Sequence, residues 1–216
     1  RKMVDHSDNA IIFFHEPYAS AACEMVAELD QYLGEKQKVS PLEAEAMMAG
    51  LMLDTKNFTM RTGGRTFEAA AFLRRAGGDT GEVKKMFQTG LADTVAKYGI
   101  IQNAKMYRQD IAIAPVDHTV NRVTAAQAAD ELLNIAGINT SFVLYPDGDR
   151  VVVSARSIND TNVQVILEAL GGGGNAGAAG AQIAGQTLKQ VTESLMATLE
   201  RYFKTDDPEE MGEEEE

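Results

Sequence analysis

The fold of the second half of the chain is decided by the stretch Phe142-Val143-Leu144-Tyr145-Pro146-Asp147-Gly148-Asp149-Arg150-Val151-Val152-Val153-Ser154. Two apolar, strand-forming runs flank a Pro-Asp-Gly-Asp turn, which predicts a β-hairpin. An extended segment over residues 106–115 precedes the hairpin, and helical patterns surround it over residues 124–136, 162–170 and 187–203. This alternation of strand and helix patterns indicates an α/β fold.

The first half of the chain reads mainly as helices. Its strongest start signal is Ser40-Pro41-Leu42-Glu43, a capping box with proline at the first helical position, for a helix that ends near Asp54. A strand-like run over residues 11–14 and a helix over residues 20–33 predict a buried βα unit before it. The apolar face expected for that helix comprises Ala22, Met25, Val26, Leu29 and Leu33.

A domain boundary is expected between the helical half and the sheet-like half. Further helical patterns precede the boundary, over residues 65–76, 79–87 and 91–103. We expect residues 89–104 to form a helical linker between a domain over 1–88 and a domain over 105–204. In the second domain, a capping box from Thr124 to Gln127 should begin the first helix.

Charge and composition exclude several classes of partner. The 216 residues carry a formal net charge of −12, but the tail from Thr205 to Glu216 holds eight acids and no base, so the rest carries −4. Duplex nucleic acid is not an expected partner, because its backbone is bound through a basic surface. The tail has too few apolar residues to order itself and is expected to be disordered.

Cysteine content and hydropathy indicate the cellular setting. Cys23 is the single cysteine and cannot form an internal disulfide, which fits a reducing, cytoplasmic location. The longest run without a polar residue, Ala46 to Leu53, is far shorter than the roughly 18 residues that span a bilayer. The chain opens on Arg1, so we expect a fragment of a longer protein, in which an upstream segment could anchor the parent to a membrane.

The segment from Gly171 to Gly185 is a candidate anion-binding loop. Twelve of its fifteen residues are glycine or alanine, and its four consecutive glycines would let backbone N–H groups converge on a phosphate. It lacks the spacing of a P-loop or a dinucleotide fingerprint. A flexible linker is the alternative, since the same composition is typical of linkers.

Two further segments carry candidate site residues. Asp54, at the end of an apolar helix, is either a metal ligand or a surface carboxylate steadied by Lys56. Arg156 either donates to a phosphate with Ser154 and Ser157 beside it, or is a solvated arginine at a strand end. The three histidines lack metal-ligand spacing among themselves and are expected to be structural: His6, His15 and His118.

Three stretches together resemble the DHH-family phosphoesterases, most of all the cyclic di-AMP phosphodiesterases. The resemblance covers nearly the whole chain up to about Lys204, and the combination is more specific than any one motif. The first stretch is His15-Glu16-Pro17-Tyr18-Ala19-Ser20. The second is Asp54-Thr55-Lys56-Asn57-Phe58 followed by Arg65-Thr66-Phe67-Glu68-Ala69-Ala70 and Leu73-Arg74-Arg75. The third is Ser154-Ala155-Arg156-Ser157 followed by Asn162-Val163-Gln164-Val165-Ile166 and Gly171 to Gly174.

The resemblance implies a fold and a chemistry. It makes residues 1–88 the C-terminal part of a DHH domain and residues 105–204 a DHH-associated, substrate-binding α/β domain with a mixed sheet. In the family, the DHH domain binds two Mn²⁺ ions that activate water for hydrolysis at phosphorus. Asp54 would correspond to the last metal-binding aspartate. The implied phosphate-binding residues are Ser154, Arg156, Ser157, Gly171, Gly172, Gly173 and Gly174.

The sequence departs from the family pattern at two places. The segment that follows the DHH triplet in the family resembles Arg1-Lys2-Met3-Val4 through Asp8-Asn9-Ala10, so Asp5-His6-Ser7 is not taken as a degenerate DHH. The earlier metal motifs are therefore expected upstream of this chain. The second departure is Asn175, which stands where the family's GGGGH segment has histidine. Asn175 would either contact phosphate or support the loop through its backbone.

The sequence thus predicts part of a manganese-dependent phosphodiesterase that hydrolyses cyclic di-AMP to a linear dinucleotide. This chain would supply the phosphate-binding domain and one metal ligand, and would be inactive alone. Two alternatives stay open, an oligoribonuclease-type DHH nuclease and a non-catalytic nucleotide-binding module. The expected partners are a cyclic dinucleotide or short nucleotide substrate and a second copy of the chain in a homodimer.

Overall fold

The computed structural model describes residues 11, 13–33, 38–158 and 160–205, and divides the chain into two units, Arg1–Gln88 and Thr89–Glu216. The expectations for residues 1–10 and for the tail beyond Thr205 lie outside the described residues. None of the described helices has the length and apolar character needed to cross a membrane.

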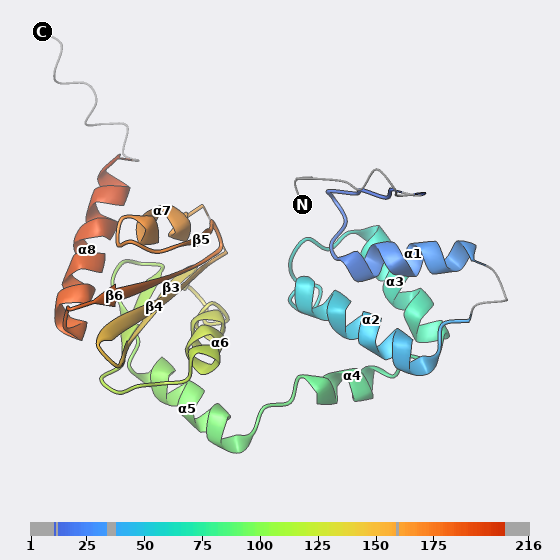
Figure 1. Ribbon diagram of the computed structural model, residues 1–216, viewed down its shortest axis with the longest axis horizontal. Helices are drawn as coiled ribbons and strands as arrows, with labels where there is room; N and C mark the ends of the chain where they lie inside the picture. Colours follow the sequence, from blue (N-terminus) through green and yellow to red (C-terminus); the bar gives the residue numbers. More distant parts are fainter. Residues whose placement is uncertain (1–10, 12, 34–37, 159, 206–216) are drawn as a thin grey trace, which may run out of the picture. The chain divides into compact units, whose positions relative to one another are not determined.

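The described residues of the first unit form four helices around a small core. They are α1 (Ala22–Tyr32), α2 (Pro41–Asp54), α3 (Gly64–Arg75) and α4 (Thr80–Met86) (Figure 1). Three of the six buried core side chains are alanines, which lets the helices approach closely at those positions. The buried core of this unit comprises Ala27, Ala44, Met48, Ala69, Leu73 and Val83.

Helix α2 begins with the predicted capping box. The Ser40 side chain accepts a hydrogen bond from the Glu43 N–H, and a Glu43 carboxylate oxygen accepts one from the Ser40 N–H at 2.8 Å. At the other end, the Thr55 hydroxyl donates to the Leu51 carbonyl at 2.7 Å and accepts from the Phe58 N–H at 3.0 Å. Thr55 thereby anchors a turn in which three successive residues have left-handed backbone conformations, Lys56, Asn57 and Phe58.

The predicted buried βα unit is wrong in two respects. The described residues of 11–14 are not in a strand, and the expected apolar face of α1 is largely exposed, with Val26 45% and Leu29 43% accessible. The buried side of α1 instead carries Ala27 and Glu24. Hydrogen bonding explains the buried acid, since a Glu24 carboxylate oxygen accepts from the hydroxyls of Ser20 and Thr66.

The second unit is built on a six-stranded sheet. The strands are β1 (Lys105–Met106), β2 (Ile111–Pro115), β3 (Thr140–Asp147), β4 (Arg150–Ser157), β5 (Gly173–Asn175) and β6 (Ala178–Ala184). Their order is β1-β2-β3-β4-β6-β5, and only β2 and β3 are parallel. The sheet is therefore mixed, and the 142–154 stretch forms its central hairpin.

Helices cover both faces of this sheet. The elements α5 (Leu91–Gln102) and α6 (Arg122–Leu132) pack on one face, and α7 (Val163–Glu168) and α8 (Leu188–Thr205) pack on the other (Figure 1). Side chains along β2 alternate between the two faces of the sheet. Ile111 and Ile113 join the core beneath α8, while Ala112 and Ala114 join the core beneath α6.

The domain boundary and the start of helix α6 differ from those expected. The helix predicted as a linker is α5, and it belongs to the second unit: Ile100 is buried in the core shared with α6, and Lys97 pairs with Glu131 at 3.0 Å. Helix α6 begins at Arg122, and its N-cap lies three residues before the expected one. The Asn121 side chain accepts from the Val123 N–H at 2.8 Å, so Asn121 takes the capping role expected of Thr124.

The glycine-rich segment is a β-hairpin rather than an open loop. Its strands β5 and β6 pair antiparallel at the edge of the sheet. Glycine is required where β5 meets β6, because a Cβ added at Gly172 would lie 2.4 Å from the Gly180 carbonyl oxygen and 2.7 Å from the Ala181 Cβ. At Gly173, by contrast, a Cβ would meet nothing within 4 Å.

This difference predicts the stability of two matched variants. Gly172→Ala should lower the free energy of unfolding by about 1–3 kcal/mol, because β6 backbone must move to accept the methyl group. Gly173→Ala should change it by no more than about 0.5 kcal/mol. Urea denaturation followed by circular dichroism measures both, and equal losses in the two variants would contradict the close packing of β5 on β6.

Candidate functional site

A cavity of about 510 Å³ lies in the second unit, a volume typical of small-molecule sites. Strands β4, β5 and β6 and the glycine turn contribute most of its lining, and α6 lines it as well. It brings together Ser154, Arg156 and the four glycines expected to bind phosphate. Its lining comprises Arg122, Ala126, Tyr145, Val152 to Ser154, Arg156, Gly171 to Gly174 and Ala178 to Gln182.

Arg156 is held in place while part of its guanidinium stays available. Its Nε donates to an Asp130 carboxylate oxygen at 3.2 Å, and its Nη1 donates to the Ala155 carbonyl at 2.9 Å. The Nη2 nitrogen makes no hydrogen bond to another described residue, and the side chain is 18% exposed. Because Asp130 projects from α6, the helix orients the arginine at the cavity wall, and Nη2 can still donate to an anion.

Ser154 lines the cavity, whereas Ser157 does not. Successive side chains of a strand point to opposite faces, so Ser154 and Arg156 share one face of β4 and Ser157 lies on the other. Ser157 is buried, its hydroxyl lies 3.2 Å from the Thr140 hydroxyl, and its N–H donates to the Gly177 carbonyl at 3.0 Å. The structure therefore does not bring Ser157 together with the other candidate residues.

The four glycines line the cavity, but two of the four N–H groups expected to converge on a phosphate already donate to backbone carbonyls. The Gly171 N–H donates to the Glu168 carbonyl at 3.0 Å, and the Gly172 N–H donates to the Leu167 carbonyl at 2.8 Å. Both amides therefore donate to carbonyl groups at the C-terminal end of α7, which lack partners within the helix. The strand β5 that follows runs along the sheet edge, where Gly173 leaves open space beside the cavity.

Asn175 supports the hairpin turn between β5 and β6. Its side-chain oxygen accepts from the Gly177 N–H at 3.0 Å and from the Ala178 N–H at 2.9 Å. Asn175 is not among the residues that line the cavity. This geometry matches the loop-supporting alternative raised from the sequence.

Three lining residues with polar side chains were not predicted as site residues from the sequence: Arg122, Tyr145 and Gln182. The strand register aligns two of them, because Val152 of β4 is opposite Tyr145 on β3 and opposite Gln182 on β6. Arg122 lies in the first turn of α6. No local motif marks these positions. Tyr145 and Gln182 could have been indicated only by the pairing of strands separated by up to about forty residues, and Arg122 only by the packing of α6 on the sheet.

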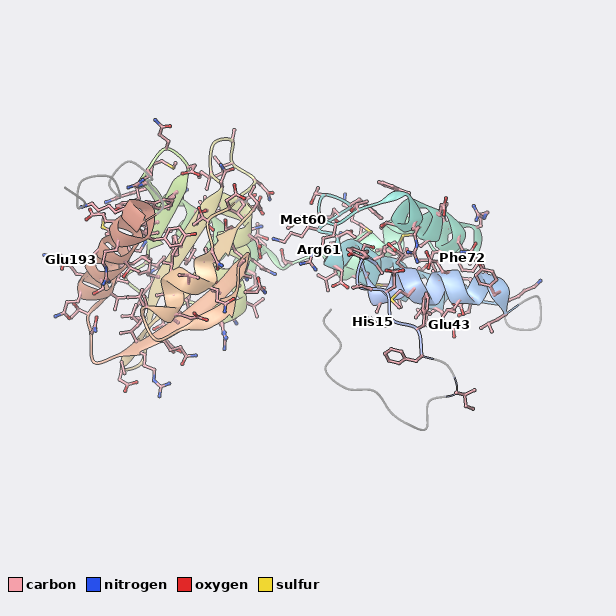
Figure 2. The ribbon with its side chains drawn as sticks, turned by 90° about the horizontal axis from the view of Figure 1, so that it is seen from above. His15, Glu43, Met60, Arg61, Phe72 and Glu193 are labelled. Carbon is pink, nitrogen blue, oxygen red and sulfur yellow. The ribbon has the colours of Figure 1, made fainter. Side chains whose placement is uncertain are left out.

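Asp54 lies at the edge of a separate cavity of about 380 Å³ in the first unit. His15, Glu16 and Arg61 also line this cavity, and Figure 2 labels His15 and Arg61. The Asp54 carboxylate makes no hydrogen bond or ion pair with another described residue, so the expected support from Lys56 is not found. The pKa of the Cys23 thiol is raised by burial and, to a lesser extent, by the negative charge of Asp54.

The described residues around Asp54 do not by themselves form a manganese site. Glu16 lines the same cavity, but one of its carboxylate oxygens accepts from Arg65 at 3.3 Å. In the part of the chain that the structure describes, no group of three or more His, Cys, Asp or Glu residues could hold a metal ion. Asp54 can therefore serve as one ligand at most of a site that needs further donors.

Comparisons with known proteins identify the second unit. Residues 108–205 match the DHHA1 domain. The cyclic-di-AMP phosphodiesterase GdpP of Geobacillus thermodenitrificans is 43% identical over 201 residues, which is 92% of this chain and 30% of the relative. The cyclic-di-AMP phosphodiesterase PdeA of Listeria monocytogenes is 36% identical over 207 residues, 94% of this chain and 32% of the relative. The chain thus spans about a third of the length of these relatives.

A solved structure supports the fold. The exopolyphosphatase-related protein from Bacteroides fragilis has a TM-score of 0.80 and 20% sequence identity, and the match covers 93% of this chain and 62% of that protein. At this identity the likeness concerns the fold alone. Sequence similarity over nine-tenths of the chain and the DHHA1 match are what establish kinship. The chain belongs to the DHH/DHHA1 phosphoesterase family, and its second unit contains the DHHA1 domain.

Proposed function

We propose that this chain is part of a manganese-dependent phosphodiesterase that hydrolyses cyclic di-AMP to a linear dinucleotide. The chain supplies the phosphate-binding domain and one metal ligand, Asp54. Two relatives named as cyclic-di-AMP phosphodiesterases support the substrate class. The observation that carries the proposal is the cavity in which Arg156, Ser154 and the glycine turn meet, although they are separated by some fifteen residues of sequence.

The cavity suits a phosphodiester for electrostatic and steric reasons. Arg156 presents Nη2 as a charged donor, and charge-assisted hydrogen bonds are the stronger ones in proteins. The Ser154 hydroxyl can add a neutral donor from the same face of β4. The absence of a side chain at Gly173 keeps one wall open, so the backbone can approach a bulky ligand.

Asp54 is proposed as a single metal ligand. Its carboxylate is exposed at the cavity edge, unpaired with any described residue, and oxygen donors suit Mn²⁺. Since no described group of three ligands surrounds it, the remaining donors come from outside the described residues. By the family resemblance, the earlier metal motifs are expected upstream of this chain, so the catalytic step is proposed for the longer protein.

A non-catalytic nucleotide-binding module is the second candidate function. The observation that favours it is the combination of a well-formed cavity lined by two arginines with the lack of a metal-binding cluster in the described residues. A module of this kind would bind a nucleotide without altering it.

The first prediction concerns Arg156. The purified chain should bind the 5′-phosphorylated adenine dinucleotide pApA, and Arg156→Ala should weaken that binding by roughly 10- to 100-fold, because a charged hydrogen bond contributes about 1.5–3 kcal/mol. Isothermal titration calorimetry measures the affinities. Arg201→Ala on α8, on the opposite face of the sheet, is the matched control. An unchanged affinity in Arg156→Ala would exclude the arginine from the site.

The second prediction concerns catalysis. The chain as given should not hydrolyse cyclic di-AMP in the presence of Mn²⁺, since Asp54 alone cannot hold a dinuclear centre. Chromatography of the nucleotide after prolonged incubation detects any product. Hydrolysis that disappears in the Asp54→Ala variant would show that the chain contains a complete site, and would overturn the division of roles proposed here.

The third prediction concerns Asn175. Asn175→His places a group with an ordinary pKa of about 6.5 at the turn, and its charge would strengthen phosphate binding below that pH if the position faced the ligand. Since the Asn175 side chain bonds the turn, we expect parallel affinity profiles for the two proteins between about pH 5.5 and 8. Tighter binding by the histidine variant at the acidic end alone would place Asn175 in the site.

A further inference from the structure

The Tyr145 hydroxyl has no hydrogen-bond partner among the described residues at the phosphate cavity. The Tyr145 residue is only 2% exposed and lines the cavity, yet its hydroxyl makes no hydrogen bond with another described residue. Buried tyrosine hydroxyls usually have a partner. No described buried side-chain oxygen or nitrogen lacks one, so this hydroxyl is itself accessible, and the cavity that Tyr145 lines is the open space beside it. It is therefore positioned to donate to a ligand there.

Arg122 lies near this hydroxyl. It also lines the cavity, it makes no hydrogen bond or ion pair with another described residue, and its positive charge acts on Tyr145. Burial and the charge of Asp147 raise the pKa of Tyr145, and Arg122 partly opposes them. The phenol is consequently neutral and a proton donor at physiological pH. Gln182 adds an amide whose oxygen already accepts from Arg150 at 3.2 Å, so its NH₂ group is the part left to donate.

These groups lie at the opposite end of the cavity from Arg156. Tyr145 is opposite Val152 in the sheet, and Arg156 follows Val152 by four residues, a rise of roughly 13 Å along the strand. Along α6, Arg122 and Asp130 are eight residues apart, roughly 12 Å along the helix axis. The cavity thus has a guanidinium near each end, with small side chains such as Ala126 between them.

The two ends differ in net charge. Arg156 is paired with the Asp130 carboxylate at 3.2 Å, which offsets its positive charge, whereas Arg122 has no paired acid among the described residues. A phosphodiester carries one negative charge, and a terminal phosphate carries about 1.5 to 2 at neutral pH. The terminal phosphate, which is the more highly charged group, should therefore favour the Arg122 end. The negative charge of Asp147 nearby reduces the positive electrostatic potential there.

We propose that Arg122 and Tyr145 form a second phosphate subsite, which binds the terminal 5′-phosphate of a linear dinucleotide whose internal phosphodiester lies at Arg156. This inference rests on the proposed function, because it assumes that the cavity binds nucleotide. It adds a consequence that the proposed function does not contain. The chain should distinguish a dinucleotide with a terminal phosphate from one without it.

Calorimetric titration of the full 216-residue chain with pApA and with ApA, which lacks the terminal phosphate, tests the subsite. The chain should bind pApA roughly tenfold or more tightly than ApA. Arg122→Gln should abolish this preference by weakening pApA alone, and it carries little risk to the fold because Arg122 is exposed. Tyr145→Phe, which keeps the buried ring, should weaken pApA severalfold. Arg201→Gln is the control for the loss of one positive charge.

The outcomes separate this subsite from the proposed function. If both nucleotides bind equally, Arg122→Gln has no effect and Arg156→Ala weakens both, then the nucleotide site stands and the second subsite is wrong. If neither nucleotide binds, both the subsite and the proposed function are wrong. If Arg122→Gln and Arg201→Gln weaken pApA equally, the preference reflects overall charge and the subsite is again wrong.

Discussion

The register of the central hairpin is the constraint on which the second unit depends. Strand β4 pairs with β3 on one side and with β6 on the other, so each of its side chains has a fixed face and fixed neighbours. Val151, Val153 and Ala155 point into the core beneath α7 and α8. Ser154 and Arg156 consequently point to the opposite face and reach the cavity. A register shift of one residue in β4 would turn its core side chains toward the cavity and its site side chains toward the core.

Small side chains leave room for the cavity on that face. Helix α6 packs on the sheet through Ala125, Ala128 and Ala129, and it covers the β2 and β3 side. Strand β5 can lie close to β6 because Gly172 has no Cβ. The strip of β4 and β6 beside α6 is therefore lined by short residues and bounded by polar ones. The Arg156–Asp130 pair links the helix to the strand at one end of that strip.

In the first unit, local hydrogen bonds at the end of α2 position Asp54. The Thr55 hydroxyl bonds both the preceding turn of helix and the N–H of Phe58, and this stabilises three consecutive left-handed residues that would otherwise be unfavourable. The turn reverses the chain immediately after the carboxylate. Asp54 is thus left exposed at the cavity edge, where it forms no ion pair with another described residue.

Local sequence determined the elements whose signals are themselves local. The α2 capping box, the Pro-Asp-Gly-Asp hairpin, the α/β fold class and the family could all be read from the chain, because each depends on residues a few positions apart or on a combination of motifs. The placement of Ser154 and Arg156 on the same face of β4 also follows from the two-residue period of a strand. The same period separates Ser157 from them, so that exclusion could have been predicted as well.

Only the tertiary structure decided which face of each element is buried and which distant residues meet. The buried side of α1 depends in part on the hydrogen bond from the Thr66 hydroxyl to Glu24, 42 residues apart, whereas its sequence pattern indicated the other face. The glycine segment became a hairpin because β4 offered β6 an unpaired edge, a partner that composition cannot reveal. Tyr145 lines the cavity because of strand register, and Arg122 lines it because of the packing of α6. Long-range contacts rather than local sequence set both of these positions.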